Sequence, residues 1–289
     1  MNPRHFIILG ACCCITIPLF LNLNLTSARQ VSTSEWKLIW NDEFDGKDGN
    51  AVDSSKWTND IGGSGWGNRE LQYYTDRLMN ASQSEGLLVI KALKEQYTGS
   101  DKVTREYTSA RLTTRKFVNV TYGRFEARIK VPHGQGVWPA FWMLGRDIDK
   151  VGWPNCGEID IMELIGKEPS NIYATVHGPG YSGAKGISVS FSLKDKERFT
   201  DGFHVFALEW EPETLRFYCD GKLYQTITRT NLPRGAKWVY DRPYFLILNL
   251  AVGGSWPGNP DSTTTFPQMM YVDYVRVYQR ATAQHSTDR

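Results

Sequence analysis

Short runs of alternating apolar and polar residues, separated by glycine- and proline-containing turns, dominate this chain of 289 residues. β-Branched and aromatic side chains are frequent within these runs, as they are in β-strands. No helical periodicity extends beyond a turn or two. The pattern therefore predicts an all-β sandwich or barrel, and the residues alone do not separate these two architectures.

The expected strands cover most of the chain after residue 35. An Asp-Gly pair at 220–221 predicts a hairpin turn between two of them. The strands are expected at 36–40, 87–93, 109–113, 123–131, 140–144, 158–163, 172–177, 203–210, 214–219, 222–227, 244–252 and 271–279.

The strand at 158–163 reads Glu-Ile-Asp-Ile-Met-Glu and carries three acids among apolar neighbours. Glu158 and Asp160 are two residues apart and share one face of a strand, whereas Glu163 would point to the opposite face of a regular strand. A β-bulge near Met162 would absorb one residue and bring Glu163 round to the same face.

Three acids this close are difficult to explain by structure alone, because like charges side by side destabilise a sheet. The alternative is a half-buried strand whose acids face water. Neighbouring carboxyl groups push their pKa values apart, so that one stays protonated while another ionises. That pairing of an acid with a nucleophile is what glycoside hydrolysis requires.

Composition narrows the class of partner. The chain has 33 basic and 31 acidic residues and a formal charge of +2, without a block of like charges. Nucleic acids and anionic membrane surfaces are therefore unsuited as partners, and a neutral polymer fits better. Ten tryptophans could supply apolar rings for a sugar-binding surface, and the alternative, which we expect for about half of them, is that they fill the core.

The amino terminus resembles a secretion signal, with Arg4, an apolar run over 6–21 and small residues at 26–28. We expect a signal peptide over 1–28, a loose segment over 29–35, a catalytic domain over 36–279 and a disordered tail over 280–289. A permanent membrane anchor is the alternative for the apolar run, and lipidation at Cys12 is a further one.

Two cysteines remain after such a cleavage, Cys156 and Cys219, and we favour two buried free thiols over a disulfide. Asn80 and Asn119 lie in tripeptides that match the N-glycosylation pattern.

Six motifs along the chain, in one order, resemble glycoside hydrolase family 16. The signature at 157–163 has the bulged form of the laminarinase-like subgroup, the endo-1,3-β-glucanases. The segment at 67–74 departs from many laminarinases, which carry a second Asn where this chain has Arg69. The six are Gly-Glu-Ile-Asp-Ile-Met-Glu at 157–163, Gly-Asn-Arg-Glu-Leu-Gln-Tyr-Tyr at 67–74, Thr-Ser-Ala-Arg-Leu at 108–112, Trp-Pro-Ala-Phe-Trp at 138–142, His-Gly-Pro-Gly-Tyr at 177–181 and Gly-Gly-Ser-Trp-Pro-Gly at 253–258.

The resemblance implies a β-jelly roll of two curved antiparallel sheets with a concave substrate cleft. It implies a secreted, monomeric, retaining endo-β-1,3-glucanase, which hydrolyses β-1,3 or mixed β-1,3-1,4 glucans. The alternatives are a β-1,3-glucan recognition protein that does not cut, a hydrolase of agar or carrageenan, and a transglycosylase.

The resemblance also assigns roles to residues of this chain. Glu158 is expected as the nucleophile, Glu163 as the general acid and base, and Asp160 as the group that keeps their ionisation states apart. Of the sugar-binding candidates, Trp142 could instead be a core residue, Arg111 a surface strand residue and His177 a structural histidine. The residues expected to bind substrate are Asn68, Arg111, Trp138, Trp142, His177 and Trp256.

No catalytic cofactor is implied, but the family commonly holds a structural calcium ion. The matching oxygen ligands here are Glu43, the Gly86 carbonyl and Asp273. The alternative is a solvated acidic turn without a metal.

Overall fold

The computed structural model describes residues 36–194 and 197–281. The expected signal peptide, the segment 29–35 and residues 282–289 lie outside these ranges. The chain divides into Met1–Thr33 and Ser34–Arg289, and the described residues all belong to the second unit. Among the described residues, no helix is both long and apolar enough to cross a membrane.

Strands account for nearly all the regular structure. The strands are β1 (Trp36–Asp42), β2 (Thr58–Asn59), β3 (Gln72–Tyr74), β4 (Ala81–Ser84), β5 (Leu87–Thr98), β6 (Thr104–Ser109), β7 (Arg111–Thr113), β8 (Gly123–Lys130), β9 (Val137–Gly145), β10 (Glu158–Glu163), β11 (Asn171–His177), β12 (Ile187–Ser192), β13 (His204–Glu211), β14 (Thr214–Cys219), β15 (Lys222–Thr228), β16 (Tyr244–Val252) and β17 (Gln268–Arg280). The helical pieces are α1 (Ile148–Val151), η1 (Gly183–Lys185) and η2 (Arg229–Asn231).

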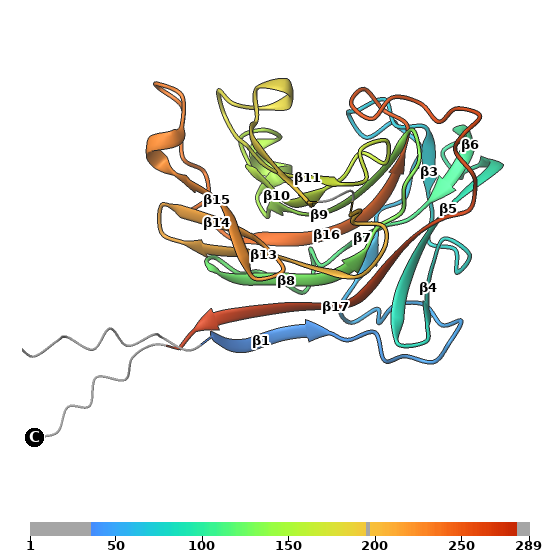
Figure 1. Ribbon diagram of the computed structural model, residues 1–289, viewed down its shortest axis with the longest axis horizontal. Helices are drawn as coiled ribbons and strands as arrows, with labels where there is room; N and C mark the ends of the chain where they lie inside the picture. The colour runs from blue at the N-terminus through green and yellow to red at the C-terminus, as the bar shows by residue number, and fades with distance from the viewer. Residues whose placement is uncertain (1–35, 195–196, 282–289) are drawn as a thin grey trace, which may run out of the picture. The chain divides into compact units, whose positions relative to one another are not determined.

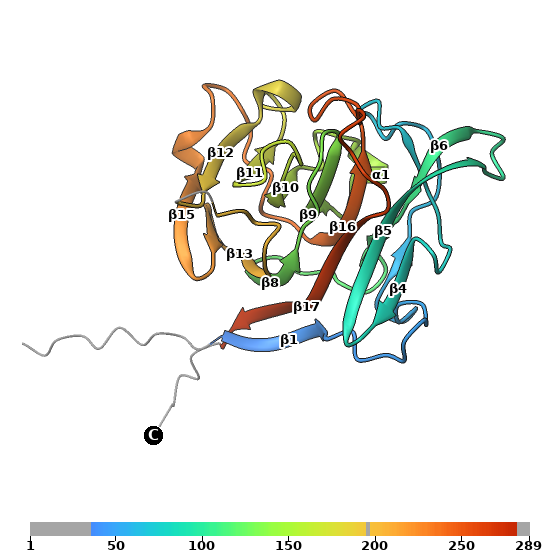
Figure 2. The same cartoon turned by 45° about the vertical axis from the view of Figure 1, so that its right-hand side comes forward.

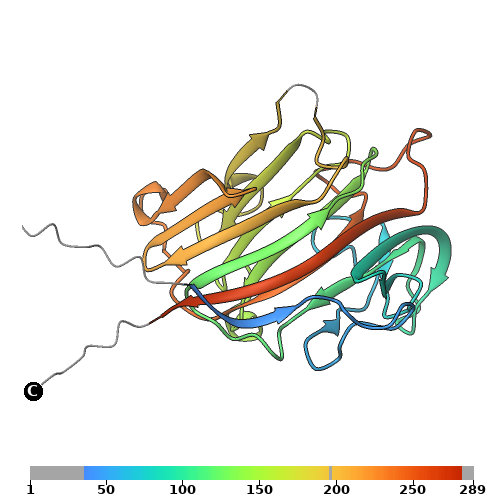
Figure 3. The same ribbon diagram turned by 60° about the horizontal axis from the view of Figure 1, so that its bottom comes forward.

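Two sheets form a β-jelly roll sandwich, as predicted. One has ten strands along the order β15-β14-β13-β8-β17-β5-β6-β3, with β1 joined to β17 and β4 to β5. The other has seven strands in the order β12-β11-β10-β9-β16-β7-β2. Figure 1 shows β9, β10, β11 and β16 side by side above β8 and β13. Figure 2 shows β17 beside β5, and Figure 3 shows the larger sheet from below.

The core lies between the sheets, where the strands bury their inward-facing side chains. In β8 every second residue is buried, and β16 is buried on both of its faces. Phe141 and Ile159 of the smaller sheet pack in the same cluster as Phe125 and Leu208 of the larger one. Side chains of the opposite parity on β9 and β10 therefore point away from the core.

The structure differs from the expected strands at several points. Strands β2, β3, β4, β6 and β12 were not expected as separate elements, and β3 pairs with β6 in parallel. The predicted disordered tail is wrong at its first residue, because Arg280 still belongs to β17 and pairs with Trp36.

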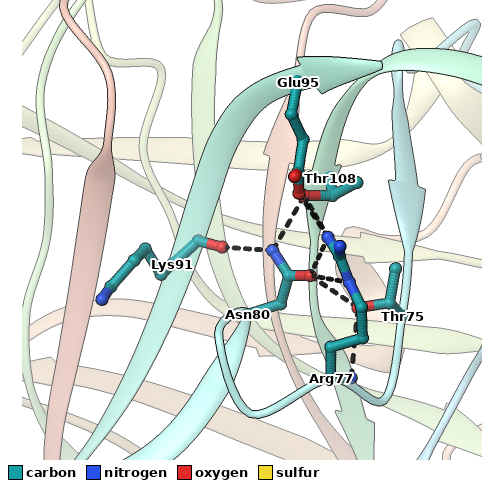
Figure 4. Close-up of polar contacts among 6 residues, drawn as sticks. All are labelled: Thr75, Arg77, Asn80, Lys91, Glu95 and Thr108. Carbon is teal, nitrogen blue, oxygen red and sulfur yellow. Dashed lines mark hydrogen bonds and ion pairs between the residues drawn. The ribbon is translucent and has the colours of Figure 1, made fainter. Parts of the chain in front are cut away.

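A buried polar cluster rules out one of the two glycosylation candidates. Asn80 is fully buried, accepts a hydrogen bond from Thr75 at 2.6 Å and donates one to Thr108 at 3.0 Å. Arg77 pairs with Glu95 in the same cluster (Figure 4). A glycan on Asn80 would break this network, whereas Asn119 is exposed.

Cys156 and Cys219 are both free and buried, as favoured from the sequence. Burial raises the pKa of the Cys156 thiol to about 11, so this thiol is inert at neutral pH.

The side chains predicted to bind calcium hold arginines instead. Both carboxylate oxygens of Glu43 accept hydrogen bonds from Arg276, at 2.9 and 2.8 Å. Asp273 accepts one from Arg128 at 2.6 Å. Guanidinium groups in this position repel a cation, so these carboxylates as arranged do not fit a calcium ligand set.

Candidate active site

The register of the smaller sheet puts the three acids on one face. Asp160 lies opposite Trp142 of β9, and Glu163 lies opposite Ala140. Over this stretch β10 therefore advances three residues while β9 advances two. Against β11, Asp160 pairs with Thr175 and Glu163 with Tyr173. The predicted bulge is therefore present, with Ile161 as the extra residue. We call the side of this sheet that carries Glu158, Asp160 and Glu163 the acid face.

The glycine before Glu158 is required by close packing. Gly157 has a φ of +77°, and a Cβ at this position would lie 1.9 Å from the Tyr244 hydroxyl oxygen. Any other residue would be strained and would push Glu158 out of register.

Glu158 receives one hydrogen bond and lies beside His177. Trp153 donates its indole N–H to Glu158 Oε2 at 2.9 Å, and His177 Nε2 lies 3.6 Å from Oε1. The side chain keeps 17% of its surface exposed. Burial, followed by the charge of Asp160, raises the pKa of Glu158 to about 8.

Asp160 is the least solvated of the three. Its side chain is 4% exposed, and Oδ2 is buried without a hydrogen-bond partner, 3.4 Å from His177 Nε2. Burial holds the pKa of Asp160 well above its usual range. An oxygen without a donor is a poor place for a charge, so Asp160 is the acid best suited to keep its proton.

Glu163 lies at the other end of the acid row. Trp138 donates its indole N–H to Glu163 Oε1 at 3.0 Å. Burial, with the charges of Asp160 and Glu158, holds the pKa of Glu163 well above its usual range. Of these two acids, Glu158 has the Trp153 N–H and the nearby His177 to stabilise its charged form, so Glu158 is the first to ionise and Glu163 keeps its proton longer. One ionised and one protonated carboxyl group are what a pair made of a nucleophile and a general acid requires.

His177 lies at the Glu158 end of the row, where it faces Glu158 and Asp160. Its Nδ1 is buried and has no hydrogen-bond partner. An orphaned N–H costs more than an orphaned lone pair, so the neutral ring carries its hydrogen on Nε2, toward the acids.

Arg111 and Trp142 form one stack on the acid face. The Arg111 guanidinium lies 4.7 Å from the ring centroids of both Trp142 and Trp66, and Arg111 Nε donates to Asp60 at 2.9 Å. Trp142 is half-buried and donates its N–H to Asn249 at 2.6 Å. Arg111 is therefore not an unpaired surface residue, and Trp142 is half-buried and also packs against a small buried cluster that includes Phe245 and Ile247.

Asn68 and Trp256 come from two loops that meet beyond Glu163. The Asn68 carbonyl accepts a hydrogen bond from the Ser255 N–H at 2.8 Å. Trp256 is 38% exposed, and its ring lies edge-on to Trp138 at 5.5 Å and to Tyr173 at 5.0 Å. These rings form an aromatic group on the Glu163 side of the acids.

Sequence reasoning missed three residues of this site. Trp153 is five residues before Glu158, so its proximity to Glu158 could have been predicted from the sequence. Tyr173 shares the parity of His177 on β11, which also signals the acid face. The contact of Trp66 with Arg111 joins a loop to β7, and no local pattern predicts it.

Comparisons with known proteins agree with this geometry. The family model described as glycosyl hydrolases family 16 matches residues 65–276. A β-glucanase of Rhodothermus marinus is 44% identical over 263 residues, which cover 88% of this chain and 89% of the relative.

Two solved structures are similar over the same region. The laminarinase catalytic domain of Thermotoga maritima is 48% identical with a TM-score of 0.81, covering 86% of this chain and all of that domain. The endo-β-1,3-glucanase of Pyrococcus furiosus is 50% identical with a TM-score of 0.81, covering 86% of this chain and 95% of its own.

Proposed function

Because this chain belongs to glycoside hydrolase family 16, in its laminarinase-like subgroup, we propose that it is a secreted, retaining endo-β-1,3-glucanase. The chain is a glycoside hydrolase, and the family's reaction needs no catalytic cofactor. The observation that carries the finer proposal is the bulge in β10, which turns Glu163 onto the face of Glu158.

In the proposed first step, Glu163 protonates the glycosidic oxygen while the Glu158 carboxylate attacks the anomeric carbon. The bond to the leaving sugar breaks, and a covalent glycosyl-enzyme forms on Glu158. In the second step Glu163, now ionised, takes a proton from water, and the water oxygen displaces Glu158. Two inversions at one carbon give net retention.

The donors around each acid support these roles. Trp153 and His177 favour the charged form of Glu158. Asp160, protonated between the two acids, limits the negative charge in the row. Trp138 fixes the Glu163 carboxyl by one oxygen and leaves the other free for the substrate.

The substrate proposal rests on the relatives and on charge. The R. marinus and P. furiosus proteins carry the names β-glucanase and endo-β-1,3-glucanase. Beside the acids, the stacked Arg111 is already paired with Asp60, which suits an uncharged glucan. Binding of the sugars is assigned to Trp138, Trp142 and Trp256. We include no calcium, because Arg276 and Arg128 hold the carboxylates concerned.

Secretion and the domain limits are part of the proposal. The charged start, the apolar run and the small residues over 1–28 support a cleaved signal peptide. The sandwich begins at Trp36 and its last strand ends at Arg280, which supports a catalytic domain over 36–280.

The test combines the substrate with the stereochemistry. Wild-type protein is expected to release reducing sugar from laminarin, and proton NMR should show the β-anomer of the new end first. Glu158→Ser should abolish release and keep laminarin binding, while Glu106→Gln, an exposed acid on the other sheet, should act as wild type. Binding without release by the wild type would favour a recognition protein. The α-anomer appearing first would end the retaining mechanism.

A further inference from the structure

One buried carboxyl group in a loop near the acid face, that of Glu70, has no part in the reaction proposed above. Glu70 lies in the loop before β3, and only 6% of its surface is exposed. Its two oxygens accept three hydrogen bonds, from Asn68 at 3.3 Å, Gln72 at 2.7 Å and Tyr74 at 3.2 Å. Burial raises the pKa of Glu70, so holding a carboxylate at this site is costly even with three donors, which indicates that the residue has a function.

A chain of buried hydrogen bonds leads from Glu70 to the tryptophan beneath the proposed cleavage point. Asn249 donates its amide to the Tyr74 hydroxyl oxygen at 3.0 Å, and Trp142 donates its indole N–H to Asn249 Oδ1 at 2.6 Å. Tyr74 is fully buried and Asn249 is 7% exposed. We call Glu70, Tyr74, Asn249 and Trp142 the Glu70 chain.

The hydrogen bonds of the Glu70 chain run in one direction, because the indole N–H of Trp142 at one end only donates and the Glu70 carboxylate at the other end only accepts. An ionised carboxylate only accepts hydrogen bonds, so the Tyr74 hydroxyl must donate to Glu70. The Tyr74 oxygen is then free to accept from the NH₂ group of Asn249. The amide is thereby held with its oxygen toward Trp142, whose indole N–H can only donate.

Each link joins a different part of the fold. Glu70 lies in a loop, Tyr74 in β3, Asn249 in β16 and Trp142 in β9. Trp142 lies directly opposite Asp160, the middle acid. The orientation of the indole beside the acids is therefore set by a residue of the loop that also carries Asn68.

We propose that Glu70 is a positioning residue for Trp142, and that it acts through this directed chain. The proposal rests on the proposed function for its kinetic consequence, because Trp142 is assigned to the sugar at the cleavage point. Glu70 itself touches neither the sugar nor the acids. Its removal misorients the ring on which the sugar lies, and a misplacement of that kind costs about 10-fold to 100-fold in rate.

The central variant is Tyr74→Phe, which removes one oxygen from the middle of the chain. Without that acceptor the NH₂ group of Asn249 loses its partner, and only the indole N–H of Trp142 still holds the amide, so the two side chains can shift together. Tyr73→Phe is the matched control, since Tyr73 is the neighbouring residue of β3, is 2% exposed and hydrogen-bonds Asp101 on the outside. Glu70→Gln is a second variant of equal size, which replaces an acceptor with a donor.

The first readout is the indole N–H signal of Trp142 in ¹⁵N-tryptophan-labelled full-length protein, assigned by its loss in Trp142→Phe. Tyr74→Phe and Glu70→Gln should both shift this signal, while Tyr73→Phe leaves it in place. The second readout is laminarin turnover, where both variants should lower kcat about 10-fold or more with a smaller change in KM.

An unmoved Trp142 signal in folded Tyr74→Phe, with kcat within about twofold of wild type, would overturn the proposal. A shifted signal in Tyr73→Phe of the same size would overturn it too, because the effect would then be general to β3. If wild-type protein releases no sugar from laminarin, the proposed function fails. The indole signal would still test whether the Glu70 chain orients Trp142.

Discussion

Glu163 and Glu158 lie on one face and receive one tryptophan N–H each, but their proposed roles differ. Glu163→Ala should slow laminarin hydrolysis by about 10²-fold to 10⁴-fold, since the leaving sugar loses its proton donor. On an aryl β-glucoside whose leaving group needs no proton, the first step should remain fast. The glycosyl-enzyme should then accumulate and be seen by mass spectrometry, and azide should restore turnover.

Glu158→Ala is the comparison for that experiment. It should give no covalent adduct with either substrate, because the attacking oxygen is gone. An adduct in Glu158→Ala and none in Glu163→Ala would mean that the two roles are exchanged.

The raised pKa of Glu158 also has a consequence for stability. Its folded value of about 8 lies above the ordinary 4.5, so the folded protein keeps a proton that the unfolded chain releases. The free energy of unfolding therefore falls as pH rises through that window. Glu158→Gln, which cannot ionise, should be more stable than wild type by about 1 to 3 kcal/mol at pH 7 and equal to it near pH 4.

Urea unfolding at the two pH values measures this difference, with Glu106→Gln as the baseline. A gain of the same size at both pH values would show that packing of the amide, and not the charge of Glu158, is responsible.

The features of the site that could be predicted from the sequence were those between residues close together along the chain. The shared face of Glu158 and Asp160 follows from their spacing, and the position of Glu163 follows once a bulge is assumed. Tyr74 and Asn249 are 175 positions apart, and their hydrogen bond depends on how β3 of one sheet packs against β16 of the other. No local pattern contains that information.

At the scale of elements, strands bounded by a clear turn or formed by an unbroken apolar run were predicted well, whereas the long strands β5 and β17 were predicted too short and several short strands were missed. The expected limits of β14 and β16 match the structure, because a clear turn or an unbroken apolar run bounds each. Strands β3 and β4 have three and four residues, and their polar residues are buried by cross-strand and loop contacts. The pairing of Glu43 with Arg276 and of Asp273 with Arg128 could not be predicted from the sequence, because it depends on which strands lie beside β17.

The bulge in β10 can be tested as an element. Deleting Ile161 removes the extra residue, and the strand becomes Glu-Ile-Asp-Met-Glu, whose acids share one face without a bulge. We expect this variant to lose stability, because a buried side chain is gone, and to keep measurable hydrolysis of laminarin. Reducing-sugar release and thermal unfolding measure the two effects.

Deleting both Ile161 and Met162 is the control. The last acid would then lie three residues after Glu158 and point into the core, so hydrolysis should disappear. Equal activity in the single and double deletions would show that the face of Glu163 does not matter.

At the scale of the whole molecule, charge bears on the class of substrate. The formal charge is +2, and Arg111, the arginine stacked on the acid face, is paired with Asp60. A neutral glucan releases no counterions on binding, so kcat/KM for laminarin should change less than about twofold between low salt and about 0.5 M salt, well beyond the concentration at which surface charges are screened. A carboxymethylated β-1,3-glucan is the matched polymer, and its turnover should depend on salt because its charges are attracted or repelled by the surface.

A steep loss of laminarin turnover with salt, in protein that stays folded, would contradict this account. It would mean that surface charges guide the polymer to the acids, as expected of an enzyme built for an anionic galactan.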